Sequence, residues 1–261
     1  HDRPEFQRID HSPPENRRNT WLGAKPESSA IPPCPVMPGI LKIVADGLKM
    51  SLKKKRRFRN LLIKNGLQEK LFAQVVELLT KRGLILKKGT IVDSTFIEAP
   101  CSTKNKDKKR DPEAHSAKKG NTWHFGYKAH VGVDHETGIV HSLEVTSANK
   151  HDVCMVAELL TGEEQLVYGD SGYLGAEKRT EAVTRNKYGK RIHYKINRRP
   201  SQNKHNSNRS RAQIKRRERE KSSVRAKVEH VFAVVKQQLR FRKTRYRGLR
   251  KPVSYTHLRA H

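Results

Sequence analysis

Aromatic residues, cysteines and long apolar runs are all scarce in this chain of 261 residues. Aromatic side chains make up 6% of the sequence and apolar ones 34%, so the apolar residues must be concentrated in a limited core. A membrane-spanning helix needs roughly 18 consecutive apolar residues, and the longest runs here are only a few residues each. The sequence therefore excludes a membrane span and predicts a soluble protein.

The three cysteines, Cys34, Cys101 and Cys154, lie far apart and form no C-x-x-C pair. This spacing argues against a disulfide framework and against a zinc knuckle, and it fits a reducing cytoplasm. No N-terminal stretch has the basic start, apolar run and cleavage site of a secretory signal. We therefore expect a cytoplasmic protein.

Acidic residues are also few. The chain has 26 Asp and Glu and 56 Lys and Arg, which gives a net charge of +30. Such a charge repels itself unless a polyanion neutralises it, and binding of Lys and Arg to a phosphate backbone releases counterions. Nucleic acid is the partner that this composition favours.

The first part of the chain has two different compositions. Residues 1–52 contain eight of the twelve prolines and little apolar periodicity, so we expect irregular structure there. Residues 53–88 form a helical basic segment in which a cluster of Lys and Arg at 53–59 is interpreted as the solvated start of a helix. Between Gly66 and Gly83, apolar residues recur at steps of three and four, which predicts an amphipathic helix.

Residues 89–251 carry the pattern of one α/β domain. β-Branched or alternating runs predict strands at 90–97, 124–133, 139–146, 165–168 and 191–196, and helices are expected at 153–160, 176–187 and 224–239. Basic segments at 102–120 and 198–221 are expected to be loops, the second flexible until it meets an anion. This order predicts an RNase H-like mixed sheet flanked by helices. Residues 252–261 stay unassigned.

Three acidic residues are candidates for catalysis. Asp93 interrupts an apolar strand, where a carboxylate is costly unless it is paired or binds a metal. Asp170 follows the strand at 165–168, and ligands of open α/β sheets bind at the carboxyl ends of strands. Glu229 lies on the last helix, on one polar stripe with Arg225 and Lys236. Taken singly, each acid also has a structural explanation: a solvent-facing strand residue, a turn residue beside glycine, or an i,i+4 ion pair with Arg225.

Together the three carboxylates predict a metal centre. Asp93, Asp170 and Glu229 supply the hard oxygen ligands that suit Mg²⁺ or Mn²⁺, and two such ions clamp the attacking and leaving oxygens of a phosphodiester. Arg225 and Lys236 are expected to hold DNA phosphates or to neutralise charge in the transition state. The histidines have no compact ligand spacing, which disfavours zinc. His151 and Asp152 are interpreted as a helix cap and packing pair.

Several runs of residues resemble one family. They are Gly89-Thr90-Ile91-Val92-Asp93, Ser102-Thr103-Lys104-Asn105, the stretch from Gly126 to Asp134, and Gly169-Asp170-Ser171-Gly172-Tyr173. The final helix is similar to a Y-x2-R-x3-E-x6-K signature at Arg225, Glu229 and Lys236. On these runs the chain from about Phe58 to Lys251 resembles DDE-type insertion-sequence transposases, particularly the IS-five group of the IS-four superfamily.

The resemblance implies a transposase that cuts DNA at the ends of its own element and joins the freed 3′-hydroxyl to a target. It implies that Asp93, Asp170 and Glu229 form the catalytic, metal-binding triad, with Mg²⁺ as cofactor and Mn²⁺ as a substitute. Arg225, Lys236 and Tyr173 would contact DNA or support the transition state. The partners implied are terminal-repeat and target DNA, with a homodimer acting on paired ends at a bacterial nucleoid.

The chain also departs from the family pattern. Ser222 stands where the signature has Tyr, residues 1–50 do not resemble a helical end-recognition region, and residues 252–261 lack the expected apolar helix. These departures are consistent with a truncated or frame-shifted copy. Two alternatives therefore stay open: a standalone RNase H-like nuclease that cuts without joining, and a non-catalytic basic DNA-binding protein descended from a transposase.

Overall fold

The computed structural model describes residues 52–104, 106, 108–199, 201, 208–244 and 247–249. The predictions for residues 1–51 and for the tail at 252–261 lie outside these residues. Within the described ranges, no helix has both the length and the apolar character that crossing a bilayer requires.

Two helices precede the sheet. Helix α2 spans Leu52–Lys64 and helix α3 spans Leu67–Lys81. Gly66, between them, has a left-handed backbone with φ of 57°, a conformation that glycine adopts without steric cost. The helix predicted between Gly66 and Gly83 is confirmed, and its apolar face packs on the main core through Phe72 and Val76.

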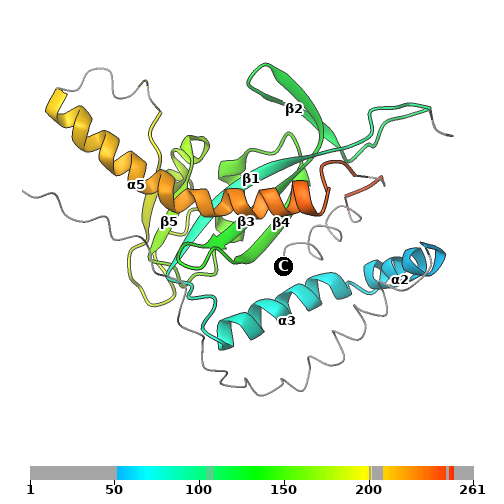
Figure 1. Cartoon of the computed structure of the whole chain (residues 1–261), viewed down its shortest axis with the longest axis horizontal. Coiled ribbons are helices and arrows are strands. Elements are labelled where there is room, and N and C mark those ends of the chain that lie inside the picture. Colours follow the sequence, from blue (N-terminus) through cyan, green and yellow to red (C-terminus); the bar gives the residue numbers. More distant parts are fainter. Residues whose placement is uncertain are drawn as a thin grey trace, which may run out of the picture. The chain divides into compact units, whose positions relative to one another are not determined.

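The sheet has six strands. They are β1 (Gly89–Glu98), β2 (His115–Lys119), β3 (Thr122–Asp134), β4 (Val140–Ser147), β5 (Leu166–Gly169) and β6 (His193–Ile196). Their order is β2-β3-β1-β5-β6, with β4 also paired to β3. Strand β1 runs antiparallel to β3 and parallel to β5, and β5 runs parallel to β6 (Figure 1). The predicted α/β class and mixed sheet are confirmed, and the arrangement is consistent with an RNase H-like domain.

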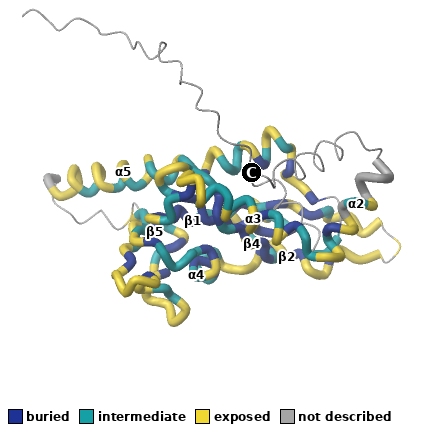
Figure 2. Tube along the Cα trace, turned by 90° about the horizontal axis from the view of Figure 1, so that it is seen from below, coloured by how far each residue is buried: buried dark blue, intermediate teal, exposed yellow. Residues whose placement is uncertain are grey.

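The sheet separates two apolar clusters because side chains alternate along each strand. Ile91 and Ile97 of β1 face helix α5 (Asn208–Ala233) and pack with its Val228. Val92 faces the other way, toward Leu159 of helix α4 (Val156–Leu159). Figure 2 shows α5 and α4 on opposite sides of the strands. Residues of β1 that share the parity of Ile91 therefore point toward α5.

Short 3-10 turns connect the later elements. They are η1 (Asp152–Met155), η2 (Ser171–Tyr173) and η3 (Ala176–Lys178), and the π-helical turn η5 (Val234–Gln238) extends α5. The helix expected at 153–160 is thus one 3-10 turn followed by α4. His151 stands at the N-cap position of η1 but makes no side-chain capping hydrogen bond, and the Asp152 carboxylate accepts a hydrogen bond from Lys128.

Two predictions between β5 and α5 were wrong. Residues 176–187 form only the turn η3, because the backbone beyond it pairs with another segment: Ile192 N–H donates to Thr184 O and Asn186 N–H to Lys190 O. The predicted loop at 198–221 is helical from Asn208. Its Arg, Lys, Glu and Gln residues have high helix propensity, and the prediction gave more weight to their charge.

The predicted loop at 102–120 was also partly wrong. Strand β2 lies within it and pairs with β3 from Lys119 opposite Thr122 to His115 opposite Gly126. The predicted hairpin of β3 and β4, by contrast, is confirmed.

One buried carboxylate ties the segment before β1 to the turn after β3. Asp134 is fully buried and accepts backbone hydrogen bonds from Leu86 and Lys87, both at 2.9 Å, and from Glu136 and Thr137 at 2.9 and 3.0 Å. Burial alone would raise the pKa of Asp134, but these four N–H groups outweigh it and lower the pKa. The ionised carboxylate therefore stabilises the fold.

Replacing Asp134 with Asn should lower the free energy of unfolding at pH 7 by about 3 kcal/mol, because the charged acceptor is lost. The native pKa of Asp134 is depressed, so its stabilisation is complete above the unfolded-state pKa of about 3.9 and disappears as the pH falls through the native value. Urea unfolding of both proteins between pH 7 and pH 3 should show the difference shrinking toward acid. A difference independent of pH would contradict this account.

Candidate active site

Asp93 and Asp170 come from neighbouring parallel strands. The β1–β5 ladder pairs Gly89 with Leu166 and Ile91 with Tyr168. Asp170 continues β5 with an extended backbone, φ −78° and ψ −179°. The β1–β5 register, extended by two residues beyond the Ile91–Tyr168 pair, places Asp93 opposite Asp170. Their backbones are then separated by the spacing of adjacent strands, about 4.8 Å.

Both aspartates belong to the sheet face that α5 covers. Residues two apart in a strand lie on the same face, so Asp93 shares a face with Ile91 and Asp170 shares one with Tyr168. Ile91 and Tyr168 pack in the cluster that contains Val228 of α5. Arg225 of α5 reaches this face, where its Nη2 lies 3.5 Å from Asp93 Oδ2. The sequence-predicted residues Asp93, Asp170 and Arg225 are therefore brought together.

The Asp93 carboxylate carries negative charge that its surroundings only partly compensate. Its side chain is 18% exposed. Burial raises the pKa of Asp93, and the neighbouring charge of Asp170 adds to that rise, while the Ser94 N–H at 2.7 Å and the Arg225 guanidinium oppose it. An added cation would relieve this imbalance.

The turn after β5 fixes the orientation of Asp170. Its Oδ1 accepts a hydrogen bond from the Gly172 N–H at 2.8 Å, which caps η2. A Cβ atom at Gly172 would lie 2.9 Å from that same oxygen. A side chain at position 172 would therefore require the Asp170 carboxylate to shift, so glycine favours the observed orientation.

The side chains of the other three predicted residues make no hydrogen bond or ion pair with Asp93 or Asp170 among the described residues. Glu229 is exposed on α5, one turn beyond Arg225, and makes no hydrogen bond or ion pair with any other described residue. Tyr173 is 1% exposed, so its ring cannot act as a DNA-contacting surface in this conformation. Burial lowers the pKa of Lys236, and the nearby cations Lys119 and Arg242 lower it further.

The α-helical geometry used to predict that Lys236 shares a stripe with Arg225 and Glu229 does not extend to Lys236. Lys236 lies in the π turn η5, which winds more slowly than an α-helix, so the α-helical wheel does not apply there. Glu98 interacts electrostatically with Lys236. Glu98 ends β1, five residues beyond Asp93.

The donor chemistry of the aspartate pair fits a hard divalent cation. Mg²⁺ is commonly held by one or two carboxylates with water completing its octahedron, and Asp93 and Asp170 are two such groups with uncompensated charge. Among the described residues, no group of three or more His, Cys, Asp or Glu side chains is assembled as a metal site. The structure therefore provides a pair of candidate ligands, and no hydrogen bond or ion pair joins Glu229 to them among the described residues.

A polar cluster behind Asp93 was missed by the sequence reasoning. The Lys128 ammonium donates to Asp152 Oδ1 at 3.1 Å, and His130 Nδ1 lies 3.7 Å from the same oxygen. His130 pairs with Ser94 across the β1–β3 ladder, so the cluster lies on the face opposite α5. A signal was available in the sequence, because the polar residues Lys128 and His130 alternate with Tyr127, Ala129 and Val131.

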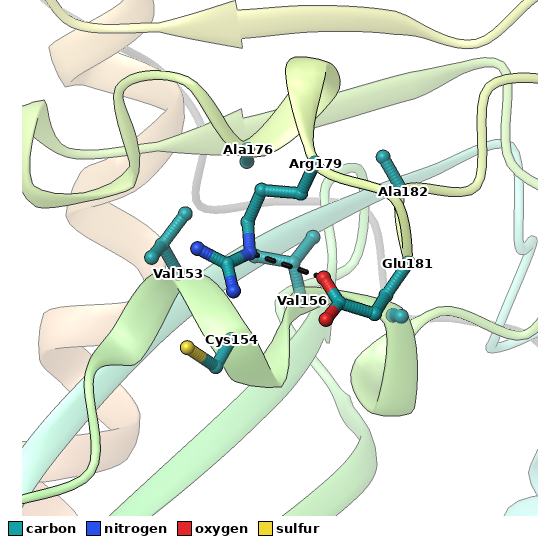
Figure 3. A pocket seen from close by; sticks show the side chains of 8 residues that line it. Val153, Cys154, Val156, Ala176, Arg179, Glu181 and Ala182 are labelled. Atoms are coloured by element: carbon teal, nitrogen blue, oxygen red, sulfur yellow. Dashed lines mark hydrogen bonds and ion pairs between the residues drawn. The ribbon is translucent and has the colours of Figure 1, made fainter.

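A separate small pocket lies between η1 and the segment after η3. Val153, Cys154 and Ala176 line it, and the Arg179–Glu181 ion pair crosses it with Nε 3.2 Å from Oε2 (Figure 3). None of its lining residues is a predicted site residue, so it is not the candidate active site.

Comparison with known proteins gives a family for this arrangement. The family described as "Transposase DDE domain" matches residues 86–261, which include both aspartates and all of α5. The chain belongs to this transposase family. The match supports a DDE transposase of the IS-four type and does not assign the IS-five group, which stays a prediction. A search of the solved structures finds no significant match.

Replacing Asp93 with Asn should raise the melting temperature of this transposase chain at pH 7 without added metal, by about 2–4 °C if the gain is about 1 kcal/mol. The native pKa of Asp93 is raised, so its ionised form destabilises the fold above that pKa and the cost vanishes below the unfolded-state value of about 3.9. The gain should therefore fade as the pH approaches 4. Calorimetry that shows a lower melting temperature for Asp93→Asn at pH 7 would mean that pairing with Arg225 outweighs burial.

Proposed function

We propose that this transposase cuts DNA at the ends of an insertion sequence of the IS-five group and joins them to target DNA in a divalent-metal-dependent reaction. In the first step, water attacks phosphorus and the bond to the 3′ oxygen breaks, which releases a 3′-hydroxyl. In the second step, that hydroxyl attacks a target phosphodiester and displaces a target 3′-hydroxyl.

The observation that carries the proposal is the register of β1 and β5, which aligns Asp93 with Asp170 under α5. A divalent cation bound there would stabilise the charge that develops on the phosphate oxygens. The two aspartates would hold the ion, with Asp93 oriented by the Ser94 N–H and Asp170 by the Gly172 N–H. The exposed Glu229, one helical turn from Arg225, is the third ligand that we propose.

Arg225 would bind the scissile phosphate. Its Nη2 lies beside Asp93, and its buried Nε has no hydrogen-bond partner among the described residues. The unused Nε–H of Arg225 could donate a charge-assisted hydrogen bond to a phosphate oxygen, which would satisfy this buried donor. Arg225 thus links the metal ligands to the DNA backbone.

The variants Asp93→Asn, Asp170→Asn and Glu229→Gln should each slow Mg²⁺-dependent nicking of a supercoiled plasmid by at least about a hundredfold, because each removes a proposed metal ligand. Binding to DNA should change little, since no basic residue is lost. Gel assays with Mg²⁺ or with EDTA measure the nicking, and filter binding measures the affinity.

A matched control is Glu220→Gln, which removes an exposed carboxylate from the same helix as Glu229. It should nick at the wild-type rate. Cleavage that survives Asp93→Asn would refute the site. Cleavage without joining of a pre-cut end would identify a standalone nuclease, and binding without any metal-dependent cleavage would identify a non-catalytic DNA-binding protein.

The first part of α5 forms a second proposed DNA contact. Residues 210–217 are exposed except for Ile214, and helix α5 extends beyond β5 in Figure 1. Packing begins at Glu218, which accepts hydrogen bonds from Asn197 and Arg198. Lys215 and Arg219 are exposed and lie four residues apart on one stripe of α5, and the segment 210–219 is called the arm. The positive charge of this part of α5 would attract the phosphates of duplex DNA.

The double variant Lys215→Ala with Arg219→Ala should reduce the dependence of DNA affinity on salt, because each lost phosphate contact lowers the slope of log K against log salt by about 0.9. The expected decrease in slope is about 2. Affinity measured between low and physiological salt tests this. The double variant Lys178→Ala with Lys190→Ala removes two exposed cations outside α5 and should leave the slope unchanged. Equal slopes for all three proteins would exclude the arm from binding.

A further inference from the structure

The hairpin of β2 and β3 ends in a narrow two-stranded ribbon. Lys119 pairs with Thr122, so the turn consists of Gly120 and Asn121 alone, and Gly120 has a left-handed backbone with φ of 60°. Residues 118–123, the hairpin tip, are all exposed. Figure 1 shows the hairpin that carries the label β2 projecting from the sheet. The hairpin tip is therefore accessible to a partner.

The base of the hairpin is anchored to the rest of the domain. Phe125 packs against the main core, and the Arg110 guanidinium lies 5.6 Å from the centre of its ring. On the other face, the His124 ring stacks on Phe96 with 4.9 Å between the ring centres. The hairpin tip is therefore held out from the domain by a fixed base.

Trp123 takes no part in this anchoring. Its side chain is 68% exposed, which is the largest exposed fraction among the large apolar residues that the structure describes. The indole makes no hydrogen bond or ring contact with any other described residue. Its burial contributes little to folding, so its apolar surface stays available for a partner.

The charge around this ring is positive. Lys118 is the cross-strand partner of Trp123, so the two side chains lie on the same face of the hairpin. Residues 115–125 include Lys118 and Lys119 and contain no Asp or Glu. Neither lysine forms an ion pair with an acidic residue of the described chain. An aromatic ring beside free cations fits nucleic acid, which offers phosphates to the lysines and bases to the ring.

The shape of the hairpin favours duplex DNA. The major groove admits a two-stranded β-ribbon, whereas the minor groove is about half as wide. Trp123 and Val131, the β3 partner of Asp93, are eight residues apart, which is roughly 26 Å along the strand. The hairpin tip would therefore meet DNA away from the phosphate that the aspartates act on.

We propose that the hairpin of β2 and β3 is a DNA-binding ribbon that enters the major groove of duplex DNA. Lys118 and Lys119 bind phosphates at the edges of the groove, and Trp123 packs against the edges of the bases. This contact is separate from the α5 arm. The inference rests on the proposed function for its choice of DNA as partner, but it is measured by binding and needs no cleavage.

Fluorescence of Trp123 tests the proposal directly. The chain has two tryptophans, Trp21 and Trp123, so the full-length variant Trp21→Phe reports on Trp123 alone. Acrylamide should quench the free protein efficiently because the ring is exposed, and a saturating linear duplex at low salt should reduce the quenching constant severalfold. Equal quenching with and without bound duplex would overturn the proposal. Protection by single-stranded DNA but not by duplex would overturn it as well.

Two variants separate the roles of the ring and the lysines. Trp123→Ala should weaken duplex binding by about fivefold or more, as expected for loss of an aromatic contact with bases, and should leave the salt dependence unchanged. Lys118→Ala with Lys119→Ala should lower the slope of log K against log salt by about 2, because two phosphate contacts are lost.

Tyr188→Ala is the matched control for Trp123→Ala. The Tyr188 ring is 65% exposed and has the Lys187 ammonium 5.1 Å from its centre, so it is another exposed aromatic ring beside a lysine. Its removal should leave duplex affinity at the wild-type value. Equal affinities for the Trp123→Ala and Tyr188→Ala variants would overturn the proposal.

Two further outcomes have distinct meanings. If Trp123→Ala keeps wild-type duplex affinity but abolishes self-association in analytical ultracentrifugation, the hairpin is a contact between copies of the chain and the proposal is wrong. If the wild-type protein does not nick DNA while duplex still protects Trp123 from acrylamide, the proposed cleavage is refuted and the DNA-binding role of the hairpin is supported.

Discussion

The parallel pairing of β1 with β5 is the constraint on which the rest of the site depends. Its register aligns Asp93 with Asp170, and the alternation of side chains turns both toward α5. Helix α5 is held on that face by Val228 in the core, and its Arg225 reaches Asp93 as a result. Two carboxylates side by side are unfavourable in a folded protein, and one arginine only partly compensates them. The fold therefore maintains a local excess of negative charge within a chain of net charge +30.

The same region contains other groups whose bonding is incomplete. Arg225 Nε and His130 Nδ1 are buried without hydrogen-bond partners among the described residues. The Asp134 carboxylate, which belongs to no proposed site, has a full set of donors. Unsatisfied polar groups lower stability wherever they occur. Glu164 Oε2, Asn197 Oδ1 and Thr244 Oγ1 are also buried without partners among the described residues, so incomplete hydrogen bonding is not confined to this part of the sheet.

Much of this arrangement could be predicted from the sequence because its signals are local. Asp93 interrupts a run of β-branched residues, and Asp170 follows a short apolar run, so each strand and its acidic residue were visible together. Lys236 could not be placed, because it lies in the π turn η5, where the α-helical wheel does not apply. The helix from Asn208 was missed because high charge was given more weight than propensity. The residues around Tyr173 come from β1, β3, η1 and η2, which are distant in the sequence. A local sequence pattern cannot predict which of them come together.

The central claim is that Asp93 and Asp170 form one divalent-metal site that Glu229 completes. Anomalous diffraction from crystals of the protein soaked in Mn²⁺ tests it most directly, because the ion and its ligands are located without reference to activity. The account predicts an anomalous peak between the two aspartate carboxylates, with the Glu229 side chain turned to coordinate it. A fully soaked crystal with no peak between these aspartates, or with Mn²⁺ bound by other residues, would contradict it.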